Sequence, residues 1–388
     1  MNVAILGFGT IGSGVYEIIE NRKSQALMDT HVVKVLDLPK NKDKLDIIVC
    51  DIKDIVEDDS IDLVGETMGG IHPAFEFITM CLESGKHVVT ANKAVVAAHL
   101  NDFLKTAKQN NVQFLFEAST GGGIPWLASI RKARRIDEIK SVSGIFNGTS
   151  NFILDHMTKM STSFEDALRL AQNLGYAEAN PSADIDGYDV QNKIVISSAL
   201  AYDTYIDINI FPTFPMRSVT FDDIKYFQSM GKTIKYMGES SVVNNEYEAF
   251  VMPNIVDNAS VEANISTNFN ITSLYGETIG QLKFYGQGAG MLPTANAIIQ
   301  DILDIQNNVP YAPIQLNKGL TYSDTLSTSK YCIRTNQYNK VDEIEEIKEY
   351  NGKNYVFTKE ITAKELKAVV EPILEKDPSA FVMKIRKG

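Results

Sequence analysis

A glycine-rich segment near the N-terminus constrains the fold more than any other feature of the sequence. Gly7-Phe8-Gly9-Thr10-Ile11-Gly12 directly follows the apolar run Asn2–Leu6 and opens an amphipathic stretch, Ile11–Glu20. A strand, a tight glycine turn and a helix in this order are typical of a dinucleotide-binding unit, whose helix N-terminus holds the pyrophosphate. A glycine pattern alone can be a plain turn, but this context favours phosphate binding.

The first 116 residues alternate between short β-branched runs and helical patterns, which is typical of a parallel sheet covered by helices on both faces. The expected strands are Asn2–Leu6, Val32–Leu36, Ile47–Val49, Leu63–Glu66, His87–Val89 and Gln113–Phe116. The expected helices include Ile11–Glu20, Pro73–Ser84 and Ala94–Asn110, whose apolar residues recur at spacings of three and four. We therefore predict a Rossmann-type, doubly wound α/β domain.

A second domain is expected beyond Glu117, where glycine-rich turns, helices and polar strands replace the regular alternation. Its expected helices are Pro125–Arg135, Ser150–Lys159, Ser163–Leu174 and Tyr188–Ala201, and β-rich sequence follows from Val242 to Phe284. Near the C-terminus, strands are expected at Tyr331–Arg334, Tyr355–Thr358 and Phe381–Ile385, and a helix is expected at Ala363–Leu374. The sequence thus predicts an α+β domain and a small C-terminal α+β module.

The bulk composition restricts the classes of partner. A formal charge of −12 gives no reason to expect a nucleic acid, because such affinity comes from lysine and arginine. The basic cluster Arg131–Arg135 is interpreted as the solvated end of a helix rather than as an anion site. The three cysteines, Cys50, Cys81 and Cys332, have spacings unsuited to zinc or disulfides. No apolar run reaches the roughly 20 residues of a membrane span, and the chain starts with a strand, so we expect a cytoplasmic protein without a targeting segment.

The type of dinucleotide depends on the end of the second strand. Asp37 follows this strand, where a carboxylate can accept hydrogen bonds from the ribose 2′-OH of NAD. Lys40, Lys42 and Lys44 follow within one loop and could instead balance a 2′-phosphate. Asp37 could also be an ordinary turn residue. The choice between NAD and NADP stays open, with Asp37 favouring NAD.

Two lysines are candidates for proton transfer at a carbonyl oxygen, a step that accompanies hydride transfer. Lys93 follows the strand His87–Val89 at the sheet edge where ligands bind, although it could be an ordinary lysine at a helix start. Lys193 follows Asp189 by four residues in an expected helix, so both side chains lie on one helix face. This spacing is also that of an ordinary exposed ion pair. The preceding loop, Gly175–Gly187, is dense in carboxylates that repel one another unless a cation lies among them. This density favours an ammonium substrate.

Six motifs together resemble the homoserine dehydrogenase family across roughly the first three hundred residues. They are GFGTIGSGV, TANKAVVA, EASTGGGIP, FNGTSNFIL, LGYAEANPSADIDGYDVQNK and FYGQGAGMLPTANAIIQDI, in this order. The family interconverts L-homoserine and L-aspartate 4-semialdehyde with NAD(P) in the aspartate route to threonine, methionine and isoleucine. The resemblance therefore implies an NAD(P)-dependent oxidoreductase whose partner is a small-molecule substrate.

The resemblance also implies a role for each matching position. Lys193 would donate and accept the proton at the C4 oxygen, Asp189 would hold Lys193 in place, and Lys93 would lie beside nicotinamide and substrate. Glu178 would receive the substrate ammonium in a pocket with Asp184, Tyr176, Gly148 and Thr149. The cofactor would contact Gly7, Phe8, Gly9, Thr10, Ile11, Gly12, Asp37, Thr90, Asn92, Lys93, Gly286 and Gly288. A monovalent cation, usually sodium, would bind Glu117 and the carbonyls of Thr120, Gly122 and Ile124, although this segment could be a plain glycine turn.

Domain limits and assembly follow from the same resemblance. The nucleotide-binding domain would be discontinuous, with residues 1–123 and 286–320, and residues 124–285 would form the substrate and dimerisation domain of a homodimer or homotetramer. Residues 325–388 would form a reduced module of the ACT type. Leu36 stands where the family often has arginine, which argues against NADP preference. The loop Thr335–Lys340 lacks the usual Asp-x-Pro-Gly turn, so threonine feedback is not expected.

Two other classes of protein are compatible with a glycine loop. Aspartate-semialdehyde dehydrogenase shares a metabolite with the family, but it needs a nucleophilic cysteine, and none of the three cysteines lies in the middle of the chain. A non-catalytic nucleotide-sensing protein could dispense with Lys93 and Lys193, yet both are present. Both alternatives are therefore disfavoured.

Overall fold

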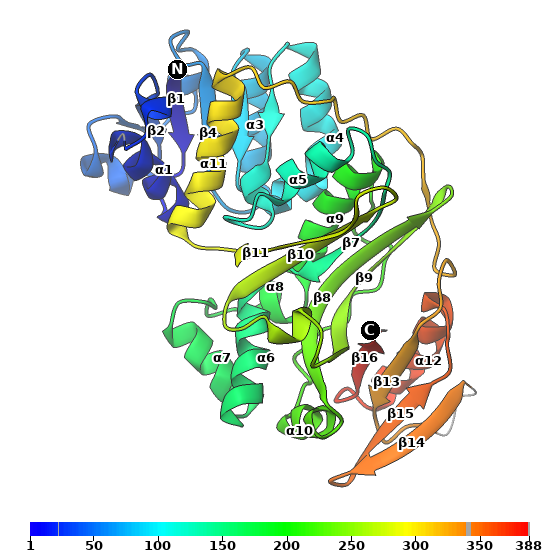
Figure 1. Cartoon of the computed structure of the whole chain (residues 1–388). Coiled ribbons are helices and arrows are strands. Elements are labelled where there is room, and N and C mark those ends of the chain that lie inside the picture. The colour runs from blue at the N-terminus through cyan, green and yellow to red at the C-terminus, as the bar shows by residue number, and fades with distance from the viewer. Residues whose placement is uncertain (22, 339–342, 387–388) are drawn as a thin grey trace. The chain divides into compact units, whose positions relative to one another are not determined.

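The computed structural model describes residues 1–21, 23–338 and 343–386, which fall into two compact units (Figure 1). The first unit consists of Met1–Ile136, Ala199–Ile206 and Gly286–Lys318. The second unit consists of Asp137–Ser198, Asp207–Tyr285 and Gly319–Gly388. Each unit is therefore built from segments that are distant in the sequence.

The first unit is built on a six-stranded parallel sheet with the strand order β3-β2-β1-β4-β5-β6. The strands are β1 (Asn2–Leu6), β2 (His31–Leu36), β3 (Ile48–Val49), β4 (Leu63–Glu66), β5 (His87–Thr90) and β6 (Phe114–Leu115). The helices are α1 (Thr10–Asn21), α2 (Lys53–Val56), α3 (Ala74–Glu83), α4 (Lys93–Gln109), α5 (Trp126–Ala133) and α11 (Met291–Gln306), with short 3-10 turns η1 (Gln25–Leu27), η2 (Pro39–Lys44) and η3 (Glu117–Ser119). The winding direction reverses between β1 and β4, so a topological switch point lies there. The predicted doubly wound parallel sheet is confirmed.

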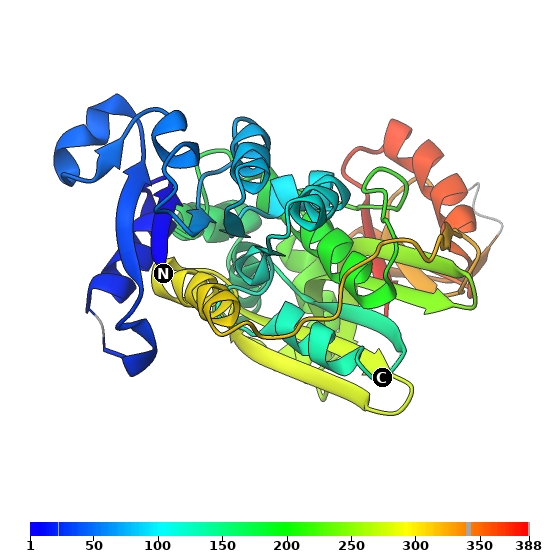
Figure 2. The ribbon, with the colours of Figure 1, turned by 90° about the horizontal axis from the view of Figure 1, so that it is seen from above.

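Helix α11 completes the core of the first unit although it comes from near residue 300. Figures 1 and 2 both show α11, in yellow, next to the blue N-terminal strand. Its buried Ala295 and Ile298 belong to the same apolar cluster as Val3 and Ile5 of β1. Gly14 of α1 permits this packing, because an added Cβ would lie 2.9 Å from Met291 Cγ. The first domain therefore depends on a segment that follows most of the second unit in the sequence.

The second unit contains a mixed ten-stranded sheet, along which the order is β11-β10-β7-β8-β9-β16-β13-β15-β14, with β12 paired to β9. The strands are β7 (Ile139–Ile145), β8 (Lys232–Val243), β9 (Glu246–Asp257), β10 (Phe269–Gly276), β11 (Gly280–Gln287), β12 (Thr321–Tyr322), β13 (Lys330–Arg334), β14 (Ile344–Tyr350), β15 (Lys353–Thr358) and β16 (Phe381–Ile385). The helices are α6 (Gly148–Met160), α7 (Phe164–Asn173), α8 (Ser182–Ile185), α9 (Tyr188–Tyr202), α10 (Phe221–Ser229), α12 (Ala363–Lys376) and the 3-10 turn η4 (Glu262–Asn264). Helices α6 and α10 pack on β8, and α6 also contacts β10.

The C-terminal strands continue the sheet of the second unit. Strand β16 pairs in parallel with β9, with Lys384 opposite Asn254 and Ile385 opposite Ile255. The expected separate module is therefore part of a larger sheet, and it contains one strand, β14, that the sequence did not predict. The reason is visible in β14 itself, an edge strand whose central residues, Glu345–Glu349, are exposed and mostly charged. Charged residues are common on strand edges and hide the alternation that identifies a strand. Among the described residues, no helix is long and apolar enough to cross a membrane.

Candidate active site

The three glycines of the loop Gly7–Gly12 differ in their surroundings: Gly9 faces open space, whereas Gly7 and Gly12 lie in close contact with other atoms. Gly7 adopts a φ of +93°, which favours glycine, and its N–H donates to the Leu36 carbonyl at 2.8 Å. A Cβ added to Gly12 would lie 2.0 Å from the Gly7 oxygen, whereas nothing lies within 4 Å of a Cβ added to Gly9. Gly12 therefore serves packing, and Gly9 exposes backbone as the close approach of a pyrophosphate requires. Helix α1 begins at Thr10, so its N-terminus carries the loop.

Asp37 is held beside this loop at the end of β2. Its Oδ2 accepts hydrogen bonds from the Phe8 N–H at 3.2 Å and the Asn41 side chain at 3.0 Å. Its Oδ1 accepts one from the Leu38 N–H at 2.7 Å. The lysines that could balance a 2′-phosphate lie on the following turn η2, which spans Pro39–Lys44. The carboxylate is thus fixed at the position from which a ribose hydroxyl is bound in this fold.

A buried carboxylate that the sequence reasoning missed joins two loops at the carboxyl edge of the sheet. Glu66, at the end of β4, accepts from the Met68 N–H at 2.8 Å and from the Thr90 hydroxyl. The Thr90 oxygen accepts from the Asn92 N–H at 2.9 Å, and the Asn92 side chain donates to the Gly70 carbonyl at 2.7 Å. Burial raises the pKa of Glu66 to about 7. An acidic residue at the end of an apolar strand was the available signal.

This network ends at a predicted catalytic lysine. Helix α4 begins at Lys93, and its N-cap is Asn92, whose side chain accepts from the Val95 N–H at 3.3 Å. Lys93 is half-buried. The loops after β4 and β5 therefore fix the backbone from which Lys93 extends.

The second unit contains the predicted pair of Asp189 and Lys193 on α9. The Lys193 ammonium lies 2.7 Å from Asp189 Oδ2, and the two side chains are only 8% and 5% exposed. It also donates to the Phe146 carbonyl at 2.7 Å. The prediction that both share one helix face is confirmed, and the alternative of an exposed surface ion pair is wrong. A buried lysine held by two oxygens has the fixed position that proton transfer requires.

Asn147 connects this pair with the carboxylate-rich loop. Its side-chain amide donates to Asp189 at 2.8 Å and to Asp184 at 2.6 Å, while its oxygen caps α6 by accepting from the Ser150 N–H at 2.7 Å. This residue was not among the predicted site residues, although it lies within the motif FNGTSNFIL. An N-cap residue that also binds two carboxylates brings α6, α8 and α9 together.

The remaining predicted substrate residues lie around the start of α6 in the same unit. The Thr149 hydroxyl donates to the Tyr176 carbonyl at 2.5 Å, and Gly148 is the first residue of α6. Asp186 forms an ion pair with Arg217. Glu178 is exposed, and within the described ranges no lysine or arginine lies at ion-pair distance from it. Arg217 thus balances Asp186 of this loop, Lys193 balances Asp189 on the following helix, and Glu178 is exposed to solvent.

Glu117 lies on η3 in the first unit and caps helix α5. Its two carboxylate oxygens accept from the Leu127 N–H at 2.9 Å and the Ala128 N–H at 2.6 Å. Burial, with repulsion from Asp301, raises the pKa of Glu117 to about 8. The described part of the chain contains no cluster of three or more His, Cys, Asp or Glu side chains that could hold a metal. A cation beside Glu117 would therefore depend on backbone carbonyls.

The turn that follows Glu117 packs against the second glycine segment. Gly122 has a φ of +57°, and an added Cβ would lie 2.5 Å from the Gly288 carbonyl carbon. The Gly123 N–H donates to the Gln287 carbonyl at 3.0 Å. An added Cβ at Gly286 would lie 3.0 Å from Ile124 Cγ1. The glycines here permit a close approach of two backbone segments.

The interpretation of the basic cluster as a solvated helix end is wrong for two of its members. Arg131 is 6% exposed, and its guanidinium lies 5.0 Å from the centre of the Phe116 ring and 4.9 Å from that of Tyr311. Arg134 forms an ion pair with Asp203. Arg131 is buried because its guanidinium forms cation–π contacts with two aromatic rings. A run of basic residues in the sequence does not reveal such contacts.

Two of the three cysteines are buried and lack the features of a catalytic nucleophile. Burial raises the pKa of Cys81 to about 12 and raises that of Cys332 well above its usual range. Cys50 is exposed, at the end of the short strand β3. A thiol reacts as its thiolate, so the two buried cysteines are inert.

The fold and these residues define a class of protein. A parallel sheet with an open glycine turn and a fixed carboxylate after its second strand is typical of proteins that bind a nicotinamide dinucleotide, and the buried Lys193 is a candidate acid–base group. The chain is thus an oxidoreductase of the dinucleotide-binding class.

Comparison with known proteins identifies the family. The family model of homoserine dehydrogenase matches residues 125–303, and the model of the homoserine dehydrogenase NAD-binding domain matches residues 7–117. The homoserine dehydrogenase of Bacillus subtilis is 33% identical over 318 residues, which cover 80% of this chain and 73% of the relative. That of Neisseria gonorrhoeae is 35% identical over 313 residues, with 79% and 72% covered. The chain belongs to the homoserine dehydrogenase family, whose members are oxidoreductases that act on the CH–OH group of homoserine.

Solved structures of the family extend the similarity to the C-terminus. A homoserine dehydrogenase from Thiobacillus denitrificans superposes with a TM-score of 0.88 at 27% identity and covers 100% of this chain and 98% of that one. The S. aureus enzyme crystallised at pH 6.5 gives a TM-score of 0.78 at 29% identity, with 100% and 99% covered. The C-terminal strands of this chain therefore have counterparts in relatives of similar length.

Proposed function

We propose that the chain catalyses the NAD(P)-dependent interconversion of L-homoserine and L-aspartate 4-semialdehyde, with Lys193 as the acid–base group. The buried position of Lys193 between Asp189 and the Phe146 carbonyl carries the proposal. In the oxidation direction, neutral Lys193 takes the proton of the C4 hydroxyl while the hydride leaves C4; in reduction, its ammonium returns the proton to the oxygen. When bound, NAD(P) would accept this hydride or supply it. This reaction belongs to the route to threonine, methionine and isoleucine.

The cofactor is proposed to bind the first unit along the carboxyl edge of its sheet. The loop Gly7–Gly12 would hold the pyrophosphate, and Thr90, Asn92 and Lys93 would contact the nicotinamide side, with Gly286 and Gly288. The open space at Gly9 supports this assignment. Asp37 favours NAD, because a fixed carboxylate repels a 2′-phosphate. A hyperthermophilic archaeal homoserine dehydrogenase was crystallised as a mutant with NADPH, but at 21% identity it supports the fold alone.

The substrate ammonium is proposed to bind Glu178, in a pocket with Asp184, Tyr176, Gly148 and Thr149. The exposed, unbalanced carboxylate of Glu178 supports this role, because a cationic ligand would remove its repulsion from neighbouring acids. Lys93 is proposed to lie beside the bound substrate. Replacing Glu178 with glutamine should raise the KM for homoserine and leave the dissociation constant of the cofactor unchanged.

A monovalent cation, in our proposal sodium, would bind the Glu117 carboxylate and the carbonyls of Thr120, Gly122 and Ile124. Cation binding can be measured without turnover, because Trp126 is the only tryptophan and its backbone N–H donates to the Ile124 carbonyl at 2.7 Å. Urea unfolding followed by Trp126 fluorescence should show a higher midpoint in sodium chloride than in choline chloride of equal ionic strength. Glu117→Gln should remove the difference. Equal midpoints in the wild-type protein would contradict the cation site.

The C-terminal part of the second unit is proposed to be a reduced ACT-like module. Its strand order, β16-β13-β15-β14, with α12 packed against it through Leu366, Val370 and Ile373, supports this assignment. We further propose a homodimer or homotetramer whose turnover threonine does not inhibit. Analytical ultracentrifugation tests the assembly, and a threonine titration of the reaction tests the absence of feedback. A monomer or strong inhibition would contradict these proposals.

One assay tests the proposed reaction directly. Absorbance at 340 nm should rise when L-homoserine is added with NAD, and the parallel reaction with NADP should be slower. Inorganic phosphate, which semialdehyde dehydrogenation consumes, should not affect the rate. No absorbance change with either cofactor would favour a non-catalytic nucleotide-binding protein.

A further inference from the structure

The carbonyl that holds Lys193 has a second donor. Phe146 O accepts from Lys193 Nζ at 2.7 Å and from the side-chain amide of Asn270 at 2.9 Å. Asn270 lies on β10 and is 1% exposed. Strand β10 pairs with β7, where Ile271 lies opposite Ile145, so the sheet register places Asn270 beside Phe146. The second hydrogen bond fixes the direction of the carbonyl toward Lys193.

Stability does not account for an asparagine at this position. The side-chain oxygen of Asn270 is buried and has no hydrogen-bond partner among the described residues. A buried unpaired oxygen costs free energy, and an apolar side chain of similar shape would avoid that cost. Phe146 O would not be left unpaired by such a change, because Lys193 still donates to it. The benefit of Asn270 therefore lies in the placement of the Phe146 carbonyl.

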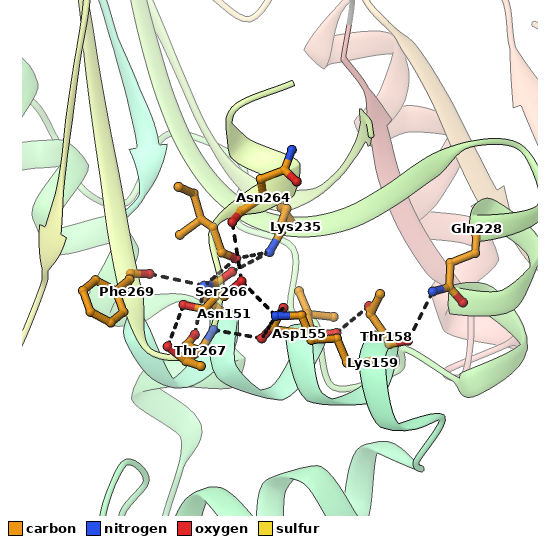
Figure 3. A network of polar contacts seen from close by, with 12 residues as sticks. Asn151, Asp155, Thr158, Lys159, Gln228, Lys235, Asn264, Ser266, Thr267 and Phe269 are labelled. Carbon is orange, nitrogen blue, oxygen red and sulfur yellow. Dashed lines mark hydrogen bonds and ion pairs between the residues drawn. The ribbon is translucent and has the colours of Figure 1, made fainter. Parts of the chain in front are cut away.

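The segment before Asn270 is tied to α6 by a buried network, which Figure 3 shows. The Asn151 side chain donates to the carbonyls of Ile265 at 3.2 Å, Thr267 at 2.9 Å and Phe269 at 3.2 Å. Lys235 of β8 donates to the Asn151 oxygen at 3.0 Å and to the Ile265 carbonyl at 2.6 Å. The buried side chains of Asn151 and Lys235 thus hold the segment that leads into β10 against α6.

The same segment reaches the first residue of α6. A Cβ added to Gly148 would lie 2.6 Å from the Asn268 carbonyl oxygen, so only glycine permits this contact. Phe146 and Asn147, which directly precede Gly148, hold Lys193 and Asp189. The backbone between β7 and α6 therefore contacts segment 265–270 through Gly148 and Phe146, and it contacts α9 through the hydrogen bonds to Lys193 and Asp189.

We propose that Asn270 is a positioning residue for the reaction, because it orients the Phe146 carbonyl that holds Lys193, and that Asn151 and Lys235 anchor the segment that carries it. The inference rests on the proposed role of Lys193 and extends it to residues on β8, α6 and β10. Asn270 itself touches neither substrate nor cofactor in this account.

Asn270→Leu tests the proposal, because leucine has the same branching but cannot donate to Phe146 O. We expect the kcat for homoserine oxidation to fall about tenfold, the effect of about one hydrogen bond. The KM for homoserine and the dissociation constant of the cofactor should stay within twofold, and the melting temperature should not fall. A structural defect would instead lower the melting temperature and the fraction of active enzyme together. If the leucine variant does not fold, Asn270→Ala, which cannot overpack, should show the same loss of kcat, although its cavity lowers the melting temperature.

Asn254→Leu is the matched control. Asn254, on β9 of the same sheet, is also 1% exposed, its buried side-chain oxygen has no partner among the described residues, and its amide donates to the Met252 carbonyl at 2.8 Å. This variant should keep the wild-type kcat. Wild-type kcat in a folded Asn270 variant would overturn the inference, as would an equal loss in both asparagine variants. Near-normal turnover of Lys193→Ala would instead refute the proposed function, so the two failures are distinguishable.

Discussion

Replacing Glu66 with glutamine changes one buried carboxyl group and leaves its surroundings in place. Glutamine can still accept from the Met68 N–H, and its amide can donate to the Thr90 oxygen, so it resembles the protonated acid. Burial raises the pKa of Glu66, and hydrogen bonds from Thr90, Met68 and Asn92 oppose this shift. The variant therefore isolates the ionisation of a single buried group.

The sign and size of the effect follow from the two states of the chain. The folded chain holds the Glu66 proton up to a pKa of about 7, whereas the unfolded chain loses it near the ordinary value of 4.5. Between these values the folded state binds more protons, so the free energy of unfolding falls as pH rises, and it levels off above about pH 7. From pH 5 to pH 8 this one group removes roughly 2 to 3 kcal/mol of stability. Glu66→Gln should lack that loss.

Urea unfolding followed by fluorescence measures this loss in the unit that contains Glu66. Trp126 is the only tryptophan, is fully buried and belongs to the same unit. The difference in unfolding free energy between variant and wild type should grow by roughly 2 to 3 kcal/mol from pH 5 to pH 8 in favour of the variant. Glu83→Gln, on the exposed side of α3, serves as the control for removal of a carboxylate. Parallel pH curves for Glu66→Gln and wild type would refute the reasoning.

Three further substitutions test other parts of the account. Gly9→Ala should fold normally but bind cofactor about tenfold more weakly in a fluorescence titration, whereas Gly12→Ala should unfold the first unit, because only the latter Cβ meets backbone. Asn151→Ala should lower the melting temperature and remove about 3 kcal/mol of stability, since three carbonyls lose a donor; an unchanged melting temperature would contradict the network. Asp189→Asn should lower kcat at least tenfold at pH 7, because Lys193 loses its charged partner in a buried site, and wild-type kcat would show that the pair is dispensable.

Local patterns made the main elements predictable from the sequence. The glycine loop after β1 and the spacing of Asp189 and Lys193 depend on neighbours within one turn or one helix, so their geometry could be read directly. The doubly wound sheet followed from the alternation of short strands and helices. Edge strands such as β14 were missed, because exposed charged residues carry no alternation signal.

Contacts between distant segments account for what the sequence could not reveal. Asn270 and Phe146 are 124 residues apart, and Glu66 and Thr90 are 24 residues apart, so only the fold shows that they meet. Arg131 lies in a basic run but is buried between two aromatic rings, one of them on the distant Tyr311. A sequence reports composition and local spacing, and the partner of a buried polar group depends on strand order and register.

The turnover of Lys193→Ala is the measurement that tests the central claim most directly. Homoserine oxidation should fall by about 100- to 10,000-fold, the contribution of an acid–base group, while cofactor binding and the melting transition stay close to those of the wild type. Turnover within a few fold of the wild-type rate would contradict the assignment of Lys193 as the group that moves the proton.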